Sequence, residues 1–214
     1  MKIRTVEDLM ERLDSELAWR KKEISHISFF IERSDFLKKG VLVRCGIALL
    51  YGHWEGFVKK GANYFLEYVA MQKLANKDLS MNLLTLSFLN SVTIPTDCKK
   101  RSPFGAITDF FLNSLEGRSK IPYNSGVDTG SNLSSKMFKE IAWCLGIDYR
   151  LFEAKENLID MRLLRPRNQI AHGEHIEMKE DEFIELKKEV LELMTLFKNQ
   201  IENNIVQKLY RRLV

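Results

Sequence analysis

The chain has 214 residues, of which 45% are apolar and 29% are charged, with 11 glycines and 4 prolines. This composition excludes collagen-like, disordered and disulfide-scaffold proteins, and no run reaches the ~18 apolar residues of a membrane span. The net charge of +4 permits a polyanionic partner without requiring one. The charged N-terminus carries no apolar secretion signal, so we expect a cytoplasmic protein with no membrane segment.

Apolar residues recur at helical spacing along most of the chain, and no segment shows the alternation typical of strands. The first helix is predicted to begin at the capping box that Thr5 and Asp8 form, and to bury an apolar stripe that Arg20 interrupts. A second helix, at about 37–75, is apolar almost all round and is expected to be central. Further helices are predicted at about 80–91, 103–115, 135–145, 151–164 and 181–211. The fold class is therefore all-α, an antiparallel bundle with long central helices.

Glycines inside the second predicted helix call for a packing reason, because glycine is unfavourable in a helix interior. We expect Gly52 and Gly56 to let a neighbouring helix come close. The alternative is a helix that bends or breaks near Gly52.

No internal repeat or linker divides the sequence, so we expect a single domain covering residues 1–214. Its core helices lie at about 5–91 and 135–211, and a loop-rich insertion occupies about 93–134. The part at 117–135 is rich in Gly, Ser and Asn. We interpret it as a flexible insertion, with a substrate flap as the alternative.

The segment 162–175, RLLRPRNQIAHGEH, contains the residues that indicate chemistry. Pro166 is expected to end the preceding helix and to start a new one, because proline lacks an N–H and fits the first helical turn. Arg167 and Asn168 would then lie at a helix N-terminus, where free amides favour a phosphate. His172 follows Asn168 by one helical turn, and Gly173 is expected to end the short helix.

This segment resembles a known family. Arg167-Asn168-x-x-x-His172 matches the R-x(4–6)-H motif of the HEPN superfamily in the form where Asn follows Arg, and the continuation Ile-Ala-His-Gly-Glu is typical of it. The sequence LYGHWEGFV at 50–58 resembles the matching long helix of the bacterial RiboL-PSP-type HEPN ribonucleases. The resemblance covers most of the chain.

The resemblance implies a HEPN-type helical bundle that forms a homodimer with a composite active site and cleaves RNA without a metal or other cofactor. It also implies a role as a toxin or an antiviral-defence effector, with an antitoxin or defence-system protein as partner. In this interpretation Arg167, His172 and Asn168 are the catalytic residues, and RNA is the substrate.

The residue types fit that chemistry. Attack of a ribose 2′-OH on the adjacent phosphate needs a proton acceptor, a proton donor and positive charge on the phosphate oxygens. His172 can exchange protons near neutral pH, and Arg167 can hold a phosphate through two N–H donors. On an ideal helix the two side chains lie about 140° apart, from five steps of about 100°. Either the arginine wraps round, or each group meets a counterpart from a second protomer.

Other residues near the motif have two interpretations. Glu55 shares a face of the second helix with Arg44, so it either orients the motif, as the resemblance suggests, or pairs with Arg44. Arg162 and Arg165 are expected to contact the RNA backbone, because with Arg167 they place three guanidinium groups within six residues.

The alternatives to catalysis remain open at this point. The motif could be structural, with a helix-end ion pair to Glu174 and a histidine that caps the helix. His172 and His175 could instead bind a metal, although further ligands are lacking and we expect no metal. The alternative functions are a non-catalytic HEPN protein that binds RNA or a nucleotide, and a dimeric interaction module that regulates a partner. The intact Arg167, Asn168 and His172 favour the ribonuclease.

Overall fold

The computed structural model describes residues 2–88, 102–123, 127, 130 and 132–212, and this part of the chain contains seven α-helices and no β-strand. The helices are α1 (Val6–Arg33), α2 (Phe36–Met71), α3 (Met81–Phe88), α4 (Ser102–Ser114), α5 (Ser135–Leu145), α6 (Arg165–Ala171) and α7 (Glu180–Val206). None of these helices is both long and apolar enough to cross a membrane. The predicted all-α class is confirmed.

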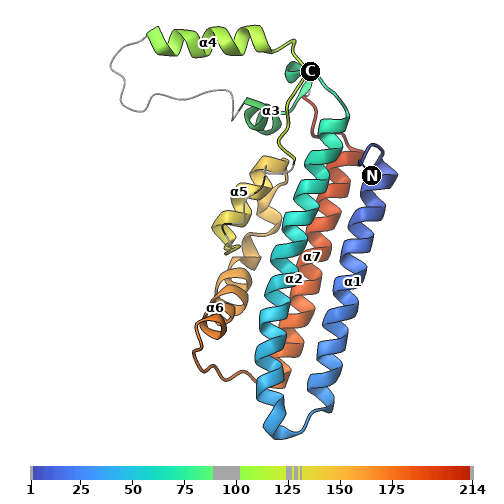
Figure 1. Cartoon of the computed structure of the whole chain (residues 1–214), viewed down its shortest axis with the longest axis vertical. Helices are drawn as coiled ribbons and strands as arrows, with labels where there is room; N and C mark the ends of the chain where they lie inside the picture. The colour runs from blue at the N-terminus through green and yellow to red at the C-terminus, as the bar shows by residue number, and fades with distance from the viewer. Residues whose placement is uncertain (1, 89–101, 124–126, 128–129, 131, 213–214) are drawn as a thin grey trace.

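The long helices α1, α2 and α7 pack side by side and form the body of the molecule, with α1 antiparallel to the other two (Figure 1). The predicted capping box is present at the start of α1, where the Thr5 hydroxyl accepts from the Asp8 N–H and the Asp8 carboxylate accepts from the Thr5 N–H. Arg20 is buried in the seam, as its interruption of the apolar stripe predicted, and its guanidinium lies 3.0 Å from the carboxylate of Glu16. A buried cation thus has a partner.

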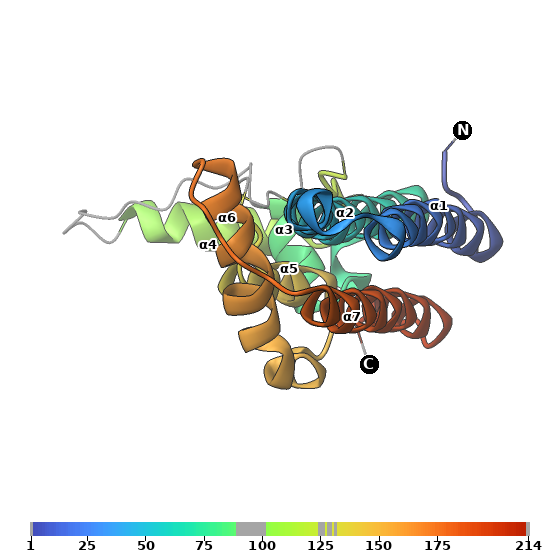
Figure 2. The same cartoon turned by 90° about the horizontal axis from the view of Figure 1, so that it is seen from below.

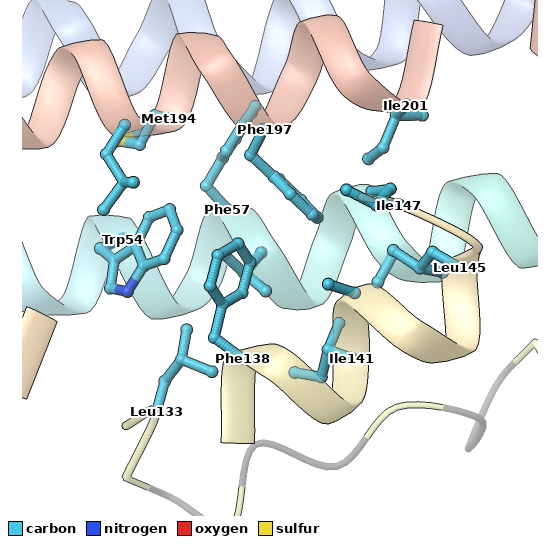
Figure 3. Packing of buried hydrophobic residues seen from close by; sticks show 14 of the residues in the cluster. Trp54, Phe57, Leu133, Phe138, Ile141, Leu145, Ile147, Met194, Phe197 and Ile201 are labelled. Carbon is cyan, nitrogen blue, oxygen red and sulfur yellow. The ribbon is translucent and has the colours of Figure 1, made fainter. Parts of the chain in front are cut away.

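Helix α5 covers one side of the α2–α7 pair, and aromatic rings fill the space between them (Figure 3). Phe138 of α5 points toward Trp54 of α2 and Phe197 of α7, with ring centroids 5.0 and 5.6 Å apart. Phe57 lies on the other side of Phe197, with centroids 6.2 Å apart. All four rings are fully buried, so the predicted central position of the second helix is confirmed.

The glycines of α2 have different roles from those predicted. The helix is continuous, so it does not break near Gly52, and a Cβ at Gly52 would meet nothing within 4 Å, so the expected close approach at this residue is wrong. Gly56 does make room, for the guanidinium of Arg20. The tightest packing is elsewhere: a Cβ at Gly46 would lie 2.5 Å from the ring of Phe183. A helix-period pattern cannot tell which glycine faces a neighbour.

Helix α4 lies in the predicted insertion and projects from the end of the molecule that also carries α3 (Figure 1). Phe110 and Phe111 of α4 contact Phe88 of α3 edge to face, with centroids 5.5 and 5.1 Å apart. The predicted end of the third helix, at 89–91, lies outside the described residues.

Candidate functional site

The motif lies on a continuous helix that begins before α6. The helical turns at 156–157 lead into a π-helix, η4 (Leu158–Leu164), and α6 follows directly. The expected helix break at Pro166 is therefore wrong, and so is the exposed helix N-terminus at Arg167. In η4 the N–H of Arg165 donates to the carbonyl of Asp160, five residues back. The π-helix ends at Leu164, two residues before Pro166, which has no N–H to donate, and such turns often occur at functional sites.

Two polar contacts fix η4 against its neighbours. The Asp160 carboxylate accepts from the N–H and the hydroxyl of Ser135, at 2.7 and 2.5 Å, at the start of α5. On the other side, the guanidinium of Arg162 donates to the carboxylates of Glu185 and Glu189 on α7. The helix that carries the motif is thus held between α5 and α7.

Arg167 is directed inward, toward α2 and the end of the insertion. Its Nη1 donates to the Oδ1 of Asn132 at 3.0 Å and to the Oδ1 of Asn168 at 2.7 Å. Its Nη2 lies 3.7 Å from a carboxylate oxygen of Glu55, and its Cζ lies 4.2 Å from the centre of the Tyr51 ring. The Arg167 side chain is only 25% exposed, so these contacts set its orientation.

Tyr51 connects Arg167 to the chain segment before α5. Its ring supports the guanidinium, while its hydroxyl accepts from the N–H of Leu133 at 2.6 Å. Burial raises the pKa of Tyr51 to about 12, an effect that the charge of Glu55 strengthens and the Leu133 N–H opposes. Tyr51 therefore remains protonated at neutral pH and acts as a support for Arg167.

His172 lies at the opposite end of α6, where it is the C-cap residue and is exposed to solvent. Its backbone N–H donates to the carbonyl of Asn168, and Gly173 follows with a left-handed φ of 78°, as the sequence predicted for the helix end. Three residues further on, His175 Nδ1 lies 3.3 Å from a guanidinium nitrogen of Arg44 on α2. The imidazole of His172 is thus presented outward while Arg167 is turned inward.

A profile of the RiboL-PSP-HEPN family matches residues 15–203, which is most of the chain. The chain belongs to the RiboL-PSP-HEPN family. No curated protein and no solved structure is significantly similar to it. The HEPN superfamily, to which this family belongs, includes many ribonucleases.

The RiboL-PSP-HEPN fold brings some of the predicted site residues together and separates others. Glu55 lies beside Arg167, whereas Arg44 is next to His175, so the alternative Glu55–Arg44 pair is not formed. Asn168 contacts Arg167 through its amide oxygen.

Two of the remaining predictions concern the flanking arginines and a metal. The guanidinium of Arg162 is engaged by carboxylates of α7, while Arg165 is exposed. Glu174 accepts from Gln169 at 3.1 Å, which gives that carboxylate a partner other than Arg167. Within the described residues, no three His, Cys, Asp or Glu side chains come together as a ligand set for a metal.

Tyr51 and Asn132 were not recognised as site residues from the sequence. Tyr51 shares a helical face with Glu55, and this spacing was a usable signal. Asn132 lies 35 residues before Arg167 in a polar loop, and nothing in its sequence context marks it.

Proposed function

We propose that this protein is a metal-independent endoribonuclease whose site contains Arg167, Asn168 and His172. The observation that carries the proposal is the environment of Arg167: a partly buried guanidinium held by Glu55, Asn132 and Asn168 at one end of a helix that presents an exposed histidine at its other end. Orienting partners of this kind are typical of functional sites.

The chemistry follows from the groups present. A histidine accepts the proton of a ribose 2′-OH, and the 2′-oxygen attacks the adjacent phosphorus as the bond to the 5′-oxygen breaks. The departing 5′-oxygen takes up the proton from that same histidine, while Arg167 stabilises the negative charge on the phosphate oxygens. The products are a 2′,3′-cyclic phosphate and a 5′-hydroxyl. DNA has no 2′-OH and is not a substrate.

The site is completed in this proposal by a second copy of the chain. Arg167 points toward α2 and His172 is exposed to solvent, which supports a site in which the two groups on one phosphate come from different protomers. A two-fold axis beside α6 would place His172 of one protomer near Arg167 of its partner, and the exposed Arg165 would then contact the RNA backbone.

The test is incubation of the purified protein with single-stranded RNA in excess chelator, followed by end-group analysis of the fragments. We expect cleavage to 2′,3′-cyclic phosphate and 5′-hydroxyl ends, lost in His172→Ala and retained in His26→Ala, which removes an exposed histidine of α1. Full activity of His172→Ala, equal cleavage of the corresponding DNA, or a requirement for added Mg²⁺ would contradict the proposal.

A further inference from the structure

A groove of about 570 Å³ lies between the first turns of α2 and the segment that joins α6 to α7. That segment starts directly after the motif and passes beside α2 on its way to α7 (Figure 2). The side chains that line the groove include Phe36, Lys39, Arg44, His175 and Met178. The groove is therefore a continuation of the candidate site along α2.

Arg44 is a cation of the groove that has an imidazole, and not a carboxylate, as its polar neighbour. Lys39 is paired with Glu180, but within the described part of the chain no carboxylate lies within 4 Å of the Arg44 guanidinium. Its polar neighbour is instead the imidazole of His175. An arginine that has no carboxylate partner and lies beside an imidazole can receive an anion.

The acids on the rim have other roles. Glu182 accepts from the Lys179 N–H and caps α7. Glu177 lies 3.8 Å from the far nitrogen of His175, away from the atom that Arg44 approaches. Neither contact neutralises Arg44.

The apolar part of the groove is suited to a nucleobase. Phe36 is 91% exposed, which is unusual for a phenylalanine, and it lies on the groove together with the half-buried Met178. An exposed aromatic ring next to a cation is the combination with which proteins bind single-stranded nucleic acids, because the ring stacks on a base while the cation contacts the backbone.

The spacing along α2 connects the groove with Arg167. Arg44 and Tyr51 are seven residues apart, so they lie on nearly the same face of α2 and about 10.5 Å apart along its axis. Tyr51 is the residue over which Arg167 lies. A strand of a few nucleotides can extend from Arg167 to Arg44.

We propose that this groove is a second RNA-binding subsite, in which Arg44 and His175 contact a backbone phosphate on one side of the cleavage point and Phe36 stacks on a base. The proposal rests on the proposed function, since RNA is the occupant. It also defines the substrate class: a single-stranded segment long enough to reach beyond the cleaved bond.

The experiment measures binding of a single-stranded decanucleotide with 2′-O-methyl groups by fluorescence anisotropy. The wild-type protein can be used because this probe lacks the 2′-OH needed for cleavage. We expect Arg44→Gln and Phe36→Ala each to weaken binding about fivefold or more. Arg44→Gln should also make the slope of log K against log salt concentration shallower by about 0.7, the value for one phosphate contact on a single strand. Phe36→Ala should leave this slope unchanged.

Matched variants and a short probe separate the subsite from general effects. Arg12→Gln and Phe30→Ala change exposed residues of α1 outside the groove, and we expect both to bind like the wild type. A 2′-O-methyl dinucleotide is too short to span both places and can bind at either one, so we expect Arg44→Gln to weaken its binding less than that of the decanucleotide. His175→Ala, at an exposed side chain, tests the same subsite without risk to the fold.

Wild-type affinity for the decanucleotide in Arg44→Gln, His175→Ala and Phe36→Ala would overturn the proposal and would leave the groove as a surface for a protein. Absence of decanucleotide binding by the wild type would overturn it as well. If the groove variants weaken binding but unmodified RNA is not cleaved, the subsite holds and the ribonuclease proposal fails. If RNA is cleaved and the groove variants bind and cleave normally, the subsite fails alone.

Discussion

Replacing Tyr51 by phenylalanine tests how the end of the insertion is fastened to the site. The substitution keeps the ring under Arg167 but removes the hydroxyl that accepts from the Leu133 N–H. Tyr51 and Leu133 are at most 1% exposed, so no water can replace the lost acceptor. A buried N–H without a partner costs about 1–3 kcal/mol, and a protein of this size loses about 2–4 °C in Tm for each kcal/mol.

The assay is urea unfolding followed by circular dichroism, with cleavage measured at 25 °C. Tyr123→Phe is the matched control, because it removes a tyrosine hydroxyl that accepts from the exposed Lys2, and we expect a change within about 0.5 kcal/mol. A loss of about 3 kcal/mol leaves a protein of ordinary stability folded. Reduced cleavage by Tyr51→Phe would therefore come from a change at the site and not from unfolding of the protein. If Tyr51→Phe unfolds at the same urea concentration as Tyr123→Phe and the wild type, the Tyr51–Leu133 hydrogen bond does not fasten this segment.

Two further predictions concern the core and the α1–α2 seam. Phe57→Ala opens a cavity among fully buried rings and is expected to lower the free energy of unfolding by about 3–5 kcal/mol. Phe30→Ala, at a ring that is 58% exposed, should lower it little. Equal stability of the two variants would contradict the packing. Burial lowers the pKa of His53 below its usual value of 6.5, although the nearby Glu23 opposes the shift. The unfolded chain therefore binds the proton more readily, and the stability that His53 contributes is complete above pH 6.5 and is lost as the pH falls below it. Between pH 7 and pH 5, the free energy of unfolding should fall less for His53→Gln than for the wild type or His26→Gln. An identical fall in all three proteins would refute this.

Much of the fold could be predicted because local signals agree with the packing. The capping box fixed the start of α1, and α5 has the predicted bounds of 135–145 because Ser134 caps its first turn and Gly146, with a φ of 70°, ends it. The final helix was predicted one residue late at its start and extended too far at its end, to Arg211, whereas α7 ends at Val206. Hydrophobic period and caps are properties of neighbouring residues, so they can be read from one sequence.

The details of the site could not be predicted because they depend on residues that are distant in the sequence. Proline normally ends a helix, but here the contacts of Asp160 with α5 accompany a π turn that carries the helix through Pro166. Arg162 was predicted to contact RNA because it lies near Arg167 in the sequence, and the sequence did not show that α7 places two carboxylates beside its guanidinium. Arg167 was identified from the motif, whereas its partner Asn132 required the tertiary structure.

The central claim is that a dimer holds two RNA-cleaving sites, each formed by the segment 162–175 of one copy together with the same segment of the other, and subunit mixing tests it most directly. His172→Ala protomers keep Arg167, and Arg167→Ala protomers keep His172, so each mixed dimer retains one complete pair. Each variant alone is expected to be inactive. After subunit exchange at equal amounts, about half of the dimers are mixed and cleavage should reach about a quarter of the wild-type rate. No recovery in dimers shown to have exchanged, or full activity of a wild-type monomer at micromolar concentration in sedimentation experiments, would contradict the account.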